Sequence, residues 1–135
     1  MAIDGLVAVV SRYGYNDTVD RLNAAISALG MTVVARIDHA AAAANVGLEL
    51  RPTEVLIFGN PKTGTPLMQT AQTIGIDLPL KILIWRDEDN KTWLGYNDPR
   101  WLAQRHGATA NTAILEAMAR ALSTIAAKVA SSPDQ

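Results

Sequence analysis

Glu54-Val55-Leu56-Ile57-Phe58, followed directly by Gly59-Asn60-Pro61, is the stretch of this 135-residue chain that decides its fold. A short, almost continuous apolar run that ends at glycine and proline is typical of a strand with apolar packing on both faces. We therefore predict a strand at 54–58 that is buried on both faces, or nearly so.

Four more short apolar runs, on either side of this stretch, predict further strands. The two nearest the C-terminus flank Arg86-Asp87-Glu88-Asp89-Asn90-Lys91, and a charged tip between two apolar runs predicts a hairpin. The four predicted strands lie at 6–10, 32–38, 80–85 and 92–96.

Helices are predicted where a capping residue precedes apolar residues at helical spacing. Asn16 or Asp17 can cap a helix that ends at Gly30, and Asp38 can cap a short alanine-rich helix at 40–44.

Two further helices and a long last one complete the prediction. Thr65-Pro66 and Asp98-Pro99 each place a capping side chain before a proline, which loses no hydrogen bond at a first helical position. We expect these helices to end at Gly75 and His106-Gly107. The last helix, at about 109–131, has the apolar stripe Ile114, Met118, Leu122, Ile125 and Val129.

The predicted order is strand, helix, strand, small helix, strand, helix, two strands and two helices. This order favours an α+β fold with a mostly antiparallel sheet and helices packed on one face. Because no internal repeat or linker is visible, we expect residues 1–135 to form a single α+β domain. Its core is expected at about 5–107 and its C-terminal helix at about 109–131.

The composition excludes several classes of function. Twelve basic and thirteen acidic residues give a net charge of −1, which argues against nucleic-acid or membrane-surface binding through bulk charge. The chain has no cysteine, so disulfides, thiol catalysis and thiolate metal sites are excluded. No apolar run approaches the ~20 residues of a membrane span. We expect a cytoplasmic protein, or a periplasmic one if a signal peptide has been removed.

The loop at 59–66 follows a strand and precedes a helix, as a phosphate-binding loop does. It lacks the lysine after the second glycine, and two prolines remove amide hydrogens that a phosphate would need. A weaker hypothesis is that Asn60, Lys62, Thr63 and the amides near Thr65 hold a carboxylate or phosphate. The alternative, which we favour, is a capped loop with a solvated lysine.

His39 and His106 are the two histidines of the chain and the candidates for a general base. Asp38 is adjacent to His39, but neighbouring side chains diverge on a strand or helix. Asp77 is a candidate orienting carboxylate that lies far away in sequence. With two histidines, no cysteine and no HExxH spacing, we expect no metal site.

The aromatic residues are concentrated around the predicted hairpin. Trp85, Trp93, Tyr96 and Trp101 fall in one short stretch. They predict either a core anchor, an aromatic pocket or a subunit interface. The nearby arginines are offset by acidic residues, which argues against nucleic-acid stacking.

Five motifs follow one another along the chain: Ala35-Arg36-Ile37-Asp38-His39, Leu50-Arg51-Pro52-Thr53-Glu54-Val55-Leu56-Ile57-Phe58-Gly59-Asn60-Pro61, Gly64-Thr65-Pro66-Leu67-Met68, Asp77-Leu78-Pro79-Leu80-Lys81 and Tyr96-Asn97-Asp98-Pro99. In this order they resemble the prokaryotic "domain of unknown function 302" family over about residues 5–107. The resemblance implies a TATA-box-binding-protein-like topology, with a ferredoxin-like one as the alternative, and usually a dimer. Such a topology implies nothing about DNA, and the family supplies no established activity, cofactor or catalytic residue.

Three functions remain open. The favoured one is a homodimeric binding module without a cofactor, whose cleft takes a small or anionic ligand. The second is a small hydrolase or isomerase with a histidine base, although the sequence has no recognisable catalytic motif. The third is a structural partner protein that docks through its last helix. The candidate ligand-binding residues are Asn60, Lys62, Thr63, Thr65, Trp85 and Asn97; the weak catalytic candidates are His39, His106, Asp38 and Asp77.

Overall fold

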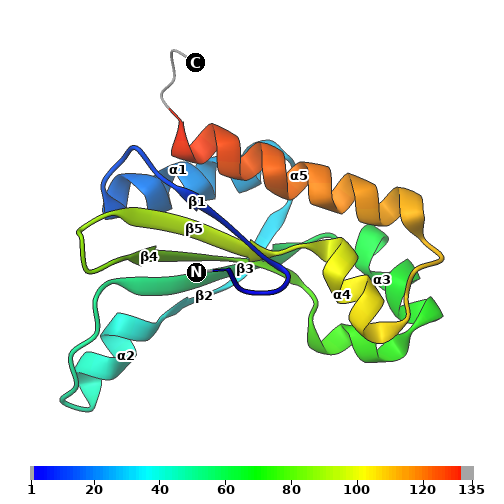
Figure 1. Cartoon of the computed structure of the whole chain (residues 1–135), viewed down its shortest axis with the longest axis horizontal. Helices are drawn as coiled ribbons and strands as arrows, with labels where there is room; N and C mark the ends of the chain where they lie inside the picture. Colours follow the sequence, from blue (N-terminus) through cyan, green and yellow to red (C-terminus); the bar gives the residue numbers. More distant parts are fainter. Residues whose placement is uncertain (1, 132–135) are drawn as a thin grey trace.

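A five-stranded sheet is the central element of the computed structural model, which describes residues 2–131 (Figure 1). The strand order is β1-β5-β4-β3-β2. All four neighbouring pairs are antiparallel, so the predicted sheet is confirmed. The strands are β1 (Leu6–Val10), β2 (Thr32–Asp38), β3 (Thr53–Gly59), β4 (Leu80–Arg86) and β5 (Thr92–Asn97).

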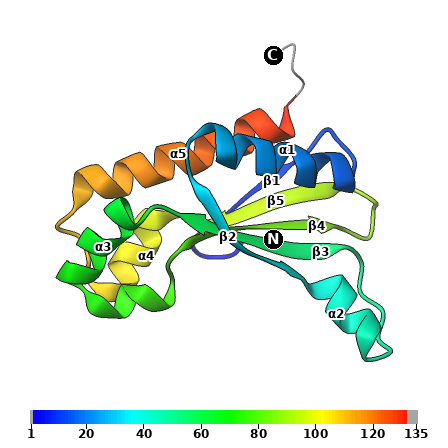
Figure 2. The ribbon, with the colours of Figure 1, turned by 180° about the vertical axis from the view of Figure 1, so that it is seen from behind.

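Two long helices, α1 (Tyr15–Ala28) and α5 (Thr112–Ala130), cover one face of this sheet (Figures 1 and 2). Alternate residues of β3 and β4 point into the layer between them, because successive side chains of a strand face opposite sides. Leu56, Phe58, Ile82 and Ile84 are each 0% exposed. The core of the molecule therefore lies between the sheet and these helices.

The opposite face of the sheet carries no helix layer. Val55 and Ile57 on this face are only half-buried, so the prediction that this strand is covered on both faces was wrong. The reason is that α1 and α5 lie on the same side, while α2 (His39–Asn45) projects away on the other side (Figures 1 and 2). We call this surface the open sheet face. Its apolar side chains, which share one side by strand register, are Leu6, Ala8, Val10, Ala35, Ile37, Val55, Ile57, Leu83, Trp85 and Trp93.

Two predicted helix starts were wrong. The N-cap of α1 is Gly14, not Asn16 or Asp17, and the amide and hydroxyl of Thr18 both donate to the Gly14 carbonyl oxygen. The helix α3 (Pro61–Thr70) begins four residues before Thr65, because the Asn60 side chain caps it.

The remaining helices follow the predicted signals more closely. Asp38 caps α2, and Asp98 caps α4 (Pro99–His106), which ends at a left-handed Gly107 with φ 68°. After α3, a separate 3-10 turn, η1 (Gln72–Ile76), replaces the predicted helix end at Gly75.

The last helix was predicted three residues too long at its start, since α5 begins at Thr112. Its predicted stripe is confirmed at Met118, Leu122, Ile125 and Val129, which are all buried. Leu115, rather than the predicted Ile114, is the fully buried residue of the first turn, and Ile114 packs partly against the core.

Glu54 is a buried charge inside β3 that the strand pattern did not reveal. Its side chain is 2% exposed and accepts a hydrogen bond of 2.7 Å from the Tyr15 hydroxyl. The Arg36 guanidinium, half exposed on β2, pairs with its other oxygen. Burial, then the hydrogen bond to Glu54, raises the pKa of Tyr15 far above its ordinary value, so the phenol stays protonated.

Candidate functional site

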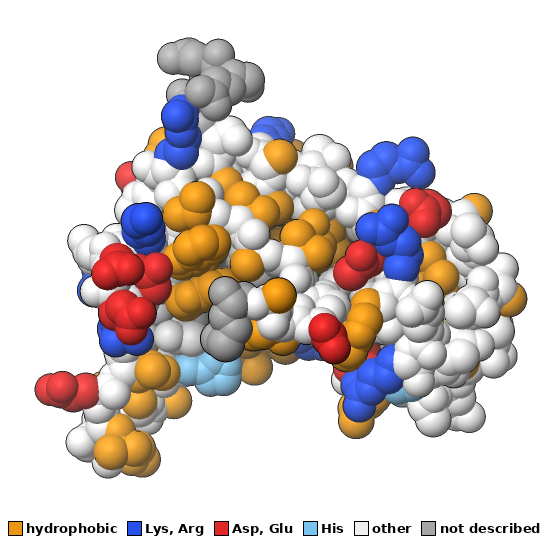
Figure 3. Space-filling model, viewed as in Figure 1, with side chains coloured by type: hydrophobic (Ala, Val, Ile, Leu, Met, Phe, Trp, Pro, Cys, Tyr) orange, Lys and Arg blue, Asp and Glu red, His pale blue; other side chains and the backbone are white. Residues whose placement is uncertain are grey.

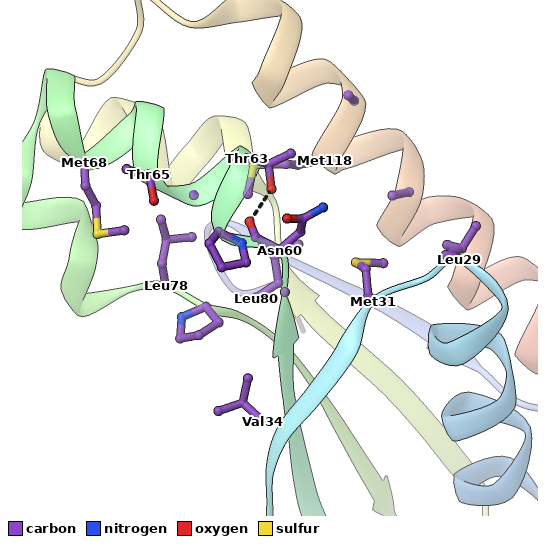
Figure 4. A pocket seen from close by; sticks show the side chains of 16 residues that line it. Leu29, Met31, Val34, Asn60, Thr63, Thr65, Met68, Leu78, Leu80 and Met118 are labelled. Carbon is purple, nitrogen blue, oxygen red and sulfur yellow. Dashed lines mark hydrogen bonds between the residues drawn. The ribbon is translucent and has the colours of Figure 1, made fainter.

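A groove of about 450 Å³ lies between α3, α5 and the start of β2 (Figure 4). Its volume is within the range of small-molecule pockets. No charged side chain lines it, and most of its lining atoms are apolar. We call it the apolar groove. It is lined by Leu29, Met31, Val34, Gly59, Asn60, Pro61, Thr63, Gly64, Thr65, Met68, Leu78, Pro79, Leu80, Ala117, Met118 and Ala121.

Three of the four methionines of the chain line this groove. Met31 precedes β2, Met68 belongs to α3, and Met118 reaches in from α5 (Figure 4). Gly75 of η1 makes room behind Met68, since a Cβ at Gly75 would lie 3.2 Å from the Met68 Sδ. Methionine is unbranched and polarisable, so such walls adapt to apolar ligands of different shape.

The polar residues at the groove are engaged in the start of α3. The Asn60 side chain accepts from the Lys62 amide at 2.9 Å. The Asn60 carbonyl oxygen accepts from the Thr63 hydroxyl at 2.9 Å, drawn in Figure 4, and from the amides of Thr63 and Gly64. Thr65 lies a full turn inside the helix. The amides on which the anion hypothesis depended are therefore already occupied within the helix.

The other predicted ligand-binding residues lie elsewhere. Lys62 is exposed and does not line the groove. Trp85 and Asn97 lie on the side of the sheet opposite α1 and α5, where Trp85 stacks on Trp93 with ring centroids 6.1 Å apart. Asn60 and Trp85, both predicted ligand-binding residues, do not line one cleft, because β4 pairs Trp85 with Thr53 at the far end of β3.

The two histidines have different surroundings. His39 is the exposed first residue of α2, and the carboxylate of Asp38 caps that helix by accepting from the Ala41 amide at 2.9 Å. Because the Asp38 carboxylate caps the helix, it is not held by the neighbouring imidazole, in line with the prediction that these two side chains diverge. In contrast, the Nε2 atom of His106 lies 2.5 Å from the Oδ2 atom of Asp77.

Two residues that were not predicted complete the cluster around His106. The Thr73 Oγ1 lies 2.9 Å from the His106 Nδ1. The Arg105 guanidinium donates to both oxygens of Asp77, at 3.1 and 2.8 Å. No sequence spacing marks this arrangement, because η1 and the end of α4 meet only through the tertiary fold. None of these residues lines the apolar groove.

No metal or membrane signal appears in the part of the chain that the structure describes. Residues 2–131 contain no group of three or more histidine, aspartate or glutamate side chains placed to hold a metal ion. Over the same residues, every helix is too short or too polar to cross a membrane.

Comparison with known proteins identifies relatives of this chain. It is 51% identical over 112 residues to "Fluoride-specific ion channel FluC 1" of Brucella suis biovar 1 (strain 1330). The aligned region covers 82% of this chain and 44% of the relative. "Fluoride-specific ion channel FluC 2" of Brucella melitensis biotype 1 is also 51% identical, with 42% of its length covered. The chain thus spans less than half the length of these curated relatives.

A solved structure shares the fold. The crystal structure of an uncharacterized conserved DUF302 protein from Bacillus stearothermophilus superposes with a TM-score of 0.84 at 20% sequence identity. The match covers 94% of this chain and 99% of that chain. The family model "Domain of unknown function DUF302" matches residues 7–125. This chain therefore belongs to the DUF302 family.

Proposed function

We propose that this DUF302 chain is a binding module that takes a small apolar molecule in the apolar groove. The observation that carries the proposal is the lining of the groove, where methionine, leucine, valine, alanine and proline surround a space of about 450 Å³. An uncharged ligand loses little hydration on entering such a site, whereas an anion would leave water without a charged partner. The proposal replaces the anionic ligand of the sequence-based hypothesis with an apolar one.

A fluorescent probe tests this proposal. N-phenyl-1-naphthylamine is uncharged and becomes bright in apolar surroundings, so its titration reports a dissociation constant. Ala117→Trp fills the groove from α5, and Ala127→Trp places the same side chain on an exposed position of α5 outside the groove. We expect Ala117→Trp to weaken binding at least about tenfold, or about 1.4 kcal/mol, and Ala127→Trp to leave it unchanged. Equal binding by both variants, or no binding by the wild type, contradicts the proposal.

We further propose that two copies of the chain pair through the open sheet face. Val10 and Ile37 are 45% and 42% exposed at opposite edges of that face. The segment after α2 adds the exposed residues Val46 and Leu48 on the same side of the sheet. Figure 3 shows hydrophobic side chains at the end of the molecule formed by α2 and this segment. An apolar surface of this kind marks an interface, and the resemblance to the family also favours a dimer.

Light scattering tests the dimer. Val10→Glu and Ile37→Glu place a charge on the open sheet face, and Ile76→Glu places one on a residue elsewhere that is 75% exposed. We expect a dimer for the wild type and for Ile76→Glu, and a monomer for the other two. A monomeric wild type, or dimers throughout, contradicts this interface.

The fluoride-channel relatives support a second candidate function. We propose that the chain corresponds to one part of such a protein and modulates its fluoride channel when the apolar groove is filled. The support is the 51% identity over 82% of this chain. Cells lacking the chain are expected to grow less well in fluoride and to recover with the wild type but not with Ala117→Trp. Growth that does not depend on the chain contradicts this role. The cytoplasm remains the proposed location, which fractionation of the same cells tests.

A docking role for α5 has less support. Its buried alanines, Ala126 and Ala130, pack within the chain's own core. Arg21 of α1 ties the end of α5 by donating to the carbonyl oxygens of Val129 and Lys128 at 3.0 and 2.9 Å. Only the outer side of this helix is free to meet a partner in the described structure.

A further inference from the structure

We propose that Thr73, His106 and Asp77 form a nucleophile, base and positioning carboxylate that hydrolyse small esters. The proposal is independent of the apolar groove and adds an activity to the binding function. Its basis is one continuous contact: the Thr73 hydroxyl oxygen is 2.9 Å from the His106 Nδ1, and the His106 Nε2 is 2.5 Å from the Asp77 Oδ2.

The hydrogen bonds determine which nitrogen of His106 acts as the base. A carboxylate accepts hydrogen bonds and donates none, so the Asp77 Oδ2 requires a hydrogen on the His106 Nε2. The neutral imidazole then carries its lone pair on Nδ1, which accepts from the Thr73 hydroxyl. This is the arrangement of a hydroxyl nucleophile held by a base that a third group orients.

Burial and charge suit each residue to its role. Thr73 is exposed, so its hydroxyl is open to a substrate. The His106 side chain is 9% exposed, which limits competition from water at the ring. Arg105 donates twice to Asp77 and so holds its carboxylate in place beside His106. A second cation, Lys81 of β4, donates to the backbone carbonyl oxygen of Asp77 at 3.3 Å.

The chemical step is acyl transfer through an ester of Thr73. The Thr73 Oγ1 attacks the substrate carbonyl carbon as its proton passes to the His106 Nδ1. The tetrahedral intermediate then expels the substrate alkoxide, which takes that proton and leaves as an alcohol. A water molecule repeats the sequence on the acyl-threonine and releases the carboxylic acid, which restores Thr73 and neutral His106. Because the cluster is outside the groove, we expect small activated esters to react rather than long-chain ones.

Hydrolysis of p-nitrophenyl acetate by the full chain tests the proposal. We expect Thr73→Val and His106→Asn to lower kcat about 10²-fold or more, as general-base catalysis contributes about 10²–10⁴-fold, and Thr73→Ser to retain activity. Thr124→Val and His39→Asn are the matched controls, since both residues are exposed and lie outside the cluster. Asp77→Asn is expected to lower kcat and leave KM unchanged, because Asp77 orients the His106 base without touching the substrate.

Mass spectrometry of the wild type gives a readout that does not depend on any variant. We expect an acetyl adduct on the peptide that carries Thr73 after rapid acid quenching. An adduct elsewhere, or a wild-type rate no greater than that of Thr73→Val, overturns the proposal. Thr73→Val and the wild type are expected to bind the fluorescent probe in the apolar groove equally well. A negative result for ester hydrolysis is therefore distinguishable from a negative result for ligand binding.

Discussion

Replacing Arg36 with leucine is expected to destabilise the protein through the buried carboxylate that it leaves behind. Glu54 is 2% exposed, and without the guanidinium it keeps the hydrogen bond from the Tyr15 hydroxyl but has lost its charged partner. Removing one member of a buried ion pair costs about 3–5 kcal/mol. Because the Arg36 side chain is 52% exposed, water can enter from its side, and we expect a loss near the lower limit, about 3 kcal/mol.

Urea unfolding near neutral pH measures this loss. Arg51→Leu removes an exposed arginine nearby and is expected to change the free energy of unfolding by less than about 0.5 kcal/mol. The triple variant Tyr15→Phe/Arg36→Leu/Glu54→Met replaces the whole cluster with apolar side chains, and we expect it to recover most of the stability. The reasoning is refuted if Arg36→Leu costs no more than Arg51→Leu, or if the triple variant is less stable than Arg36→Leu alone.

Two further predictions concern glycine packing and helix capping. Thermal unfolding measures the free energy of unfolding of both glycine variants. Gly95→Ala is expected to lower it by about 1–3 kcal/mol, because the new Cβ would lie 2.9 Å from a Trp85 ring atom. Gly64→Ala, inside α3 with no contact below 3.8 Å, is expected to raise it by about 0.5–1 kcal/mol. A Gly95→Ala variant as stable as the wild type, or a Gly64→Ala variant that is less stable, would contradict the packing argument. Hydrogen bonds from the Arg100 side chain and amide lower the pKa of Asp98. The stability that Asp98→Asn removes is therefore present at neutral pH and disappears as the pH falls below about 4. A stability difference between this variant and the wild type that is constant from pH 7 to pH 2 would argue against this ion pair.

The strands and most helices were predictable because each is signalled by local residues. The apolar run of β3 and the Asp98-Pro99 start of α4 specify their own conformation within a few positions. The start of α3 was harder, since Asn60-Pro61 and Thr65-Pro66 carry the same signal five residues apart. Asparagine is the stronger cap, and the earlier start prevailed.

The candidate sites were predictable only in part. Asn60, Thr63 and Thr65 do line the groove, but its apolar character comes from methionines that are far apart in sequence and meet only in the tertiary fold. Asp77 and His106, two of the predicted acid–base candidates, lie in contact, yet nothing local distinguished that pair from Asp38 and His39. Which faces of the sheet are covered also depends on helix placement, so the exposure of Val55 and Ile57 was not visible in the strand pattern.

The central claim, an apolar ligand in the groove, is tested most directly by methyl NMR of protein labelled with ¹³C at its methionine methyl groups. Met31, Met68 and Met118 all line the groove, and Met→Leu variants assign their signals. We expect decanol to shift all three signals with one common dissociation constant, and inorganic phosphate to shift none. No saturable shift with decanol, or shifts with phosphate instead, would contradict the claim.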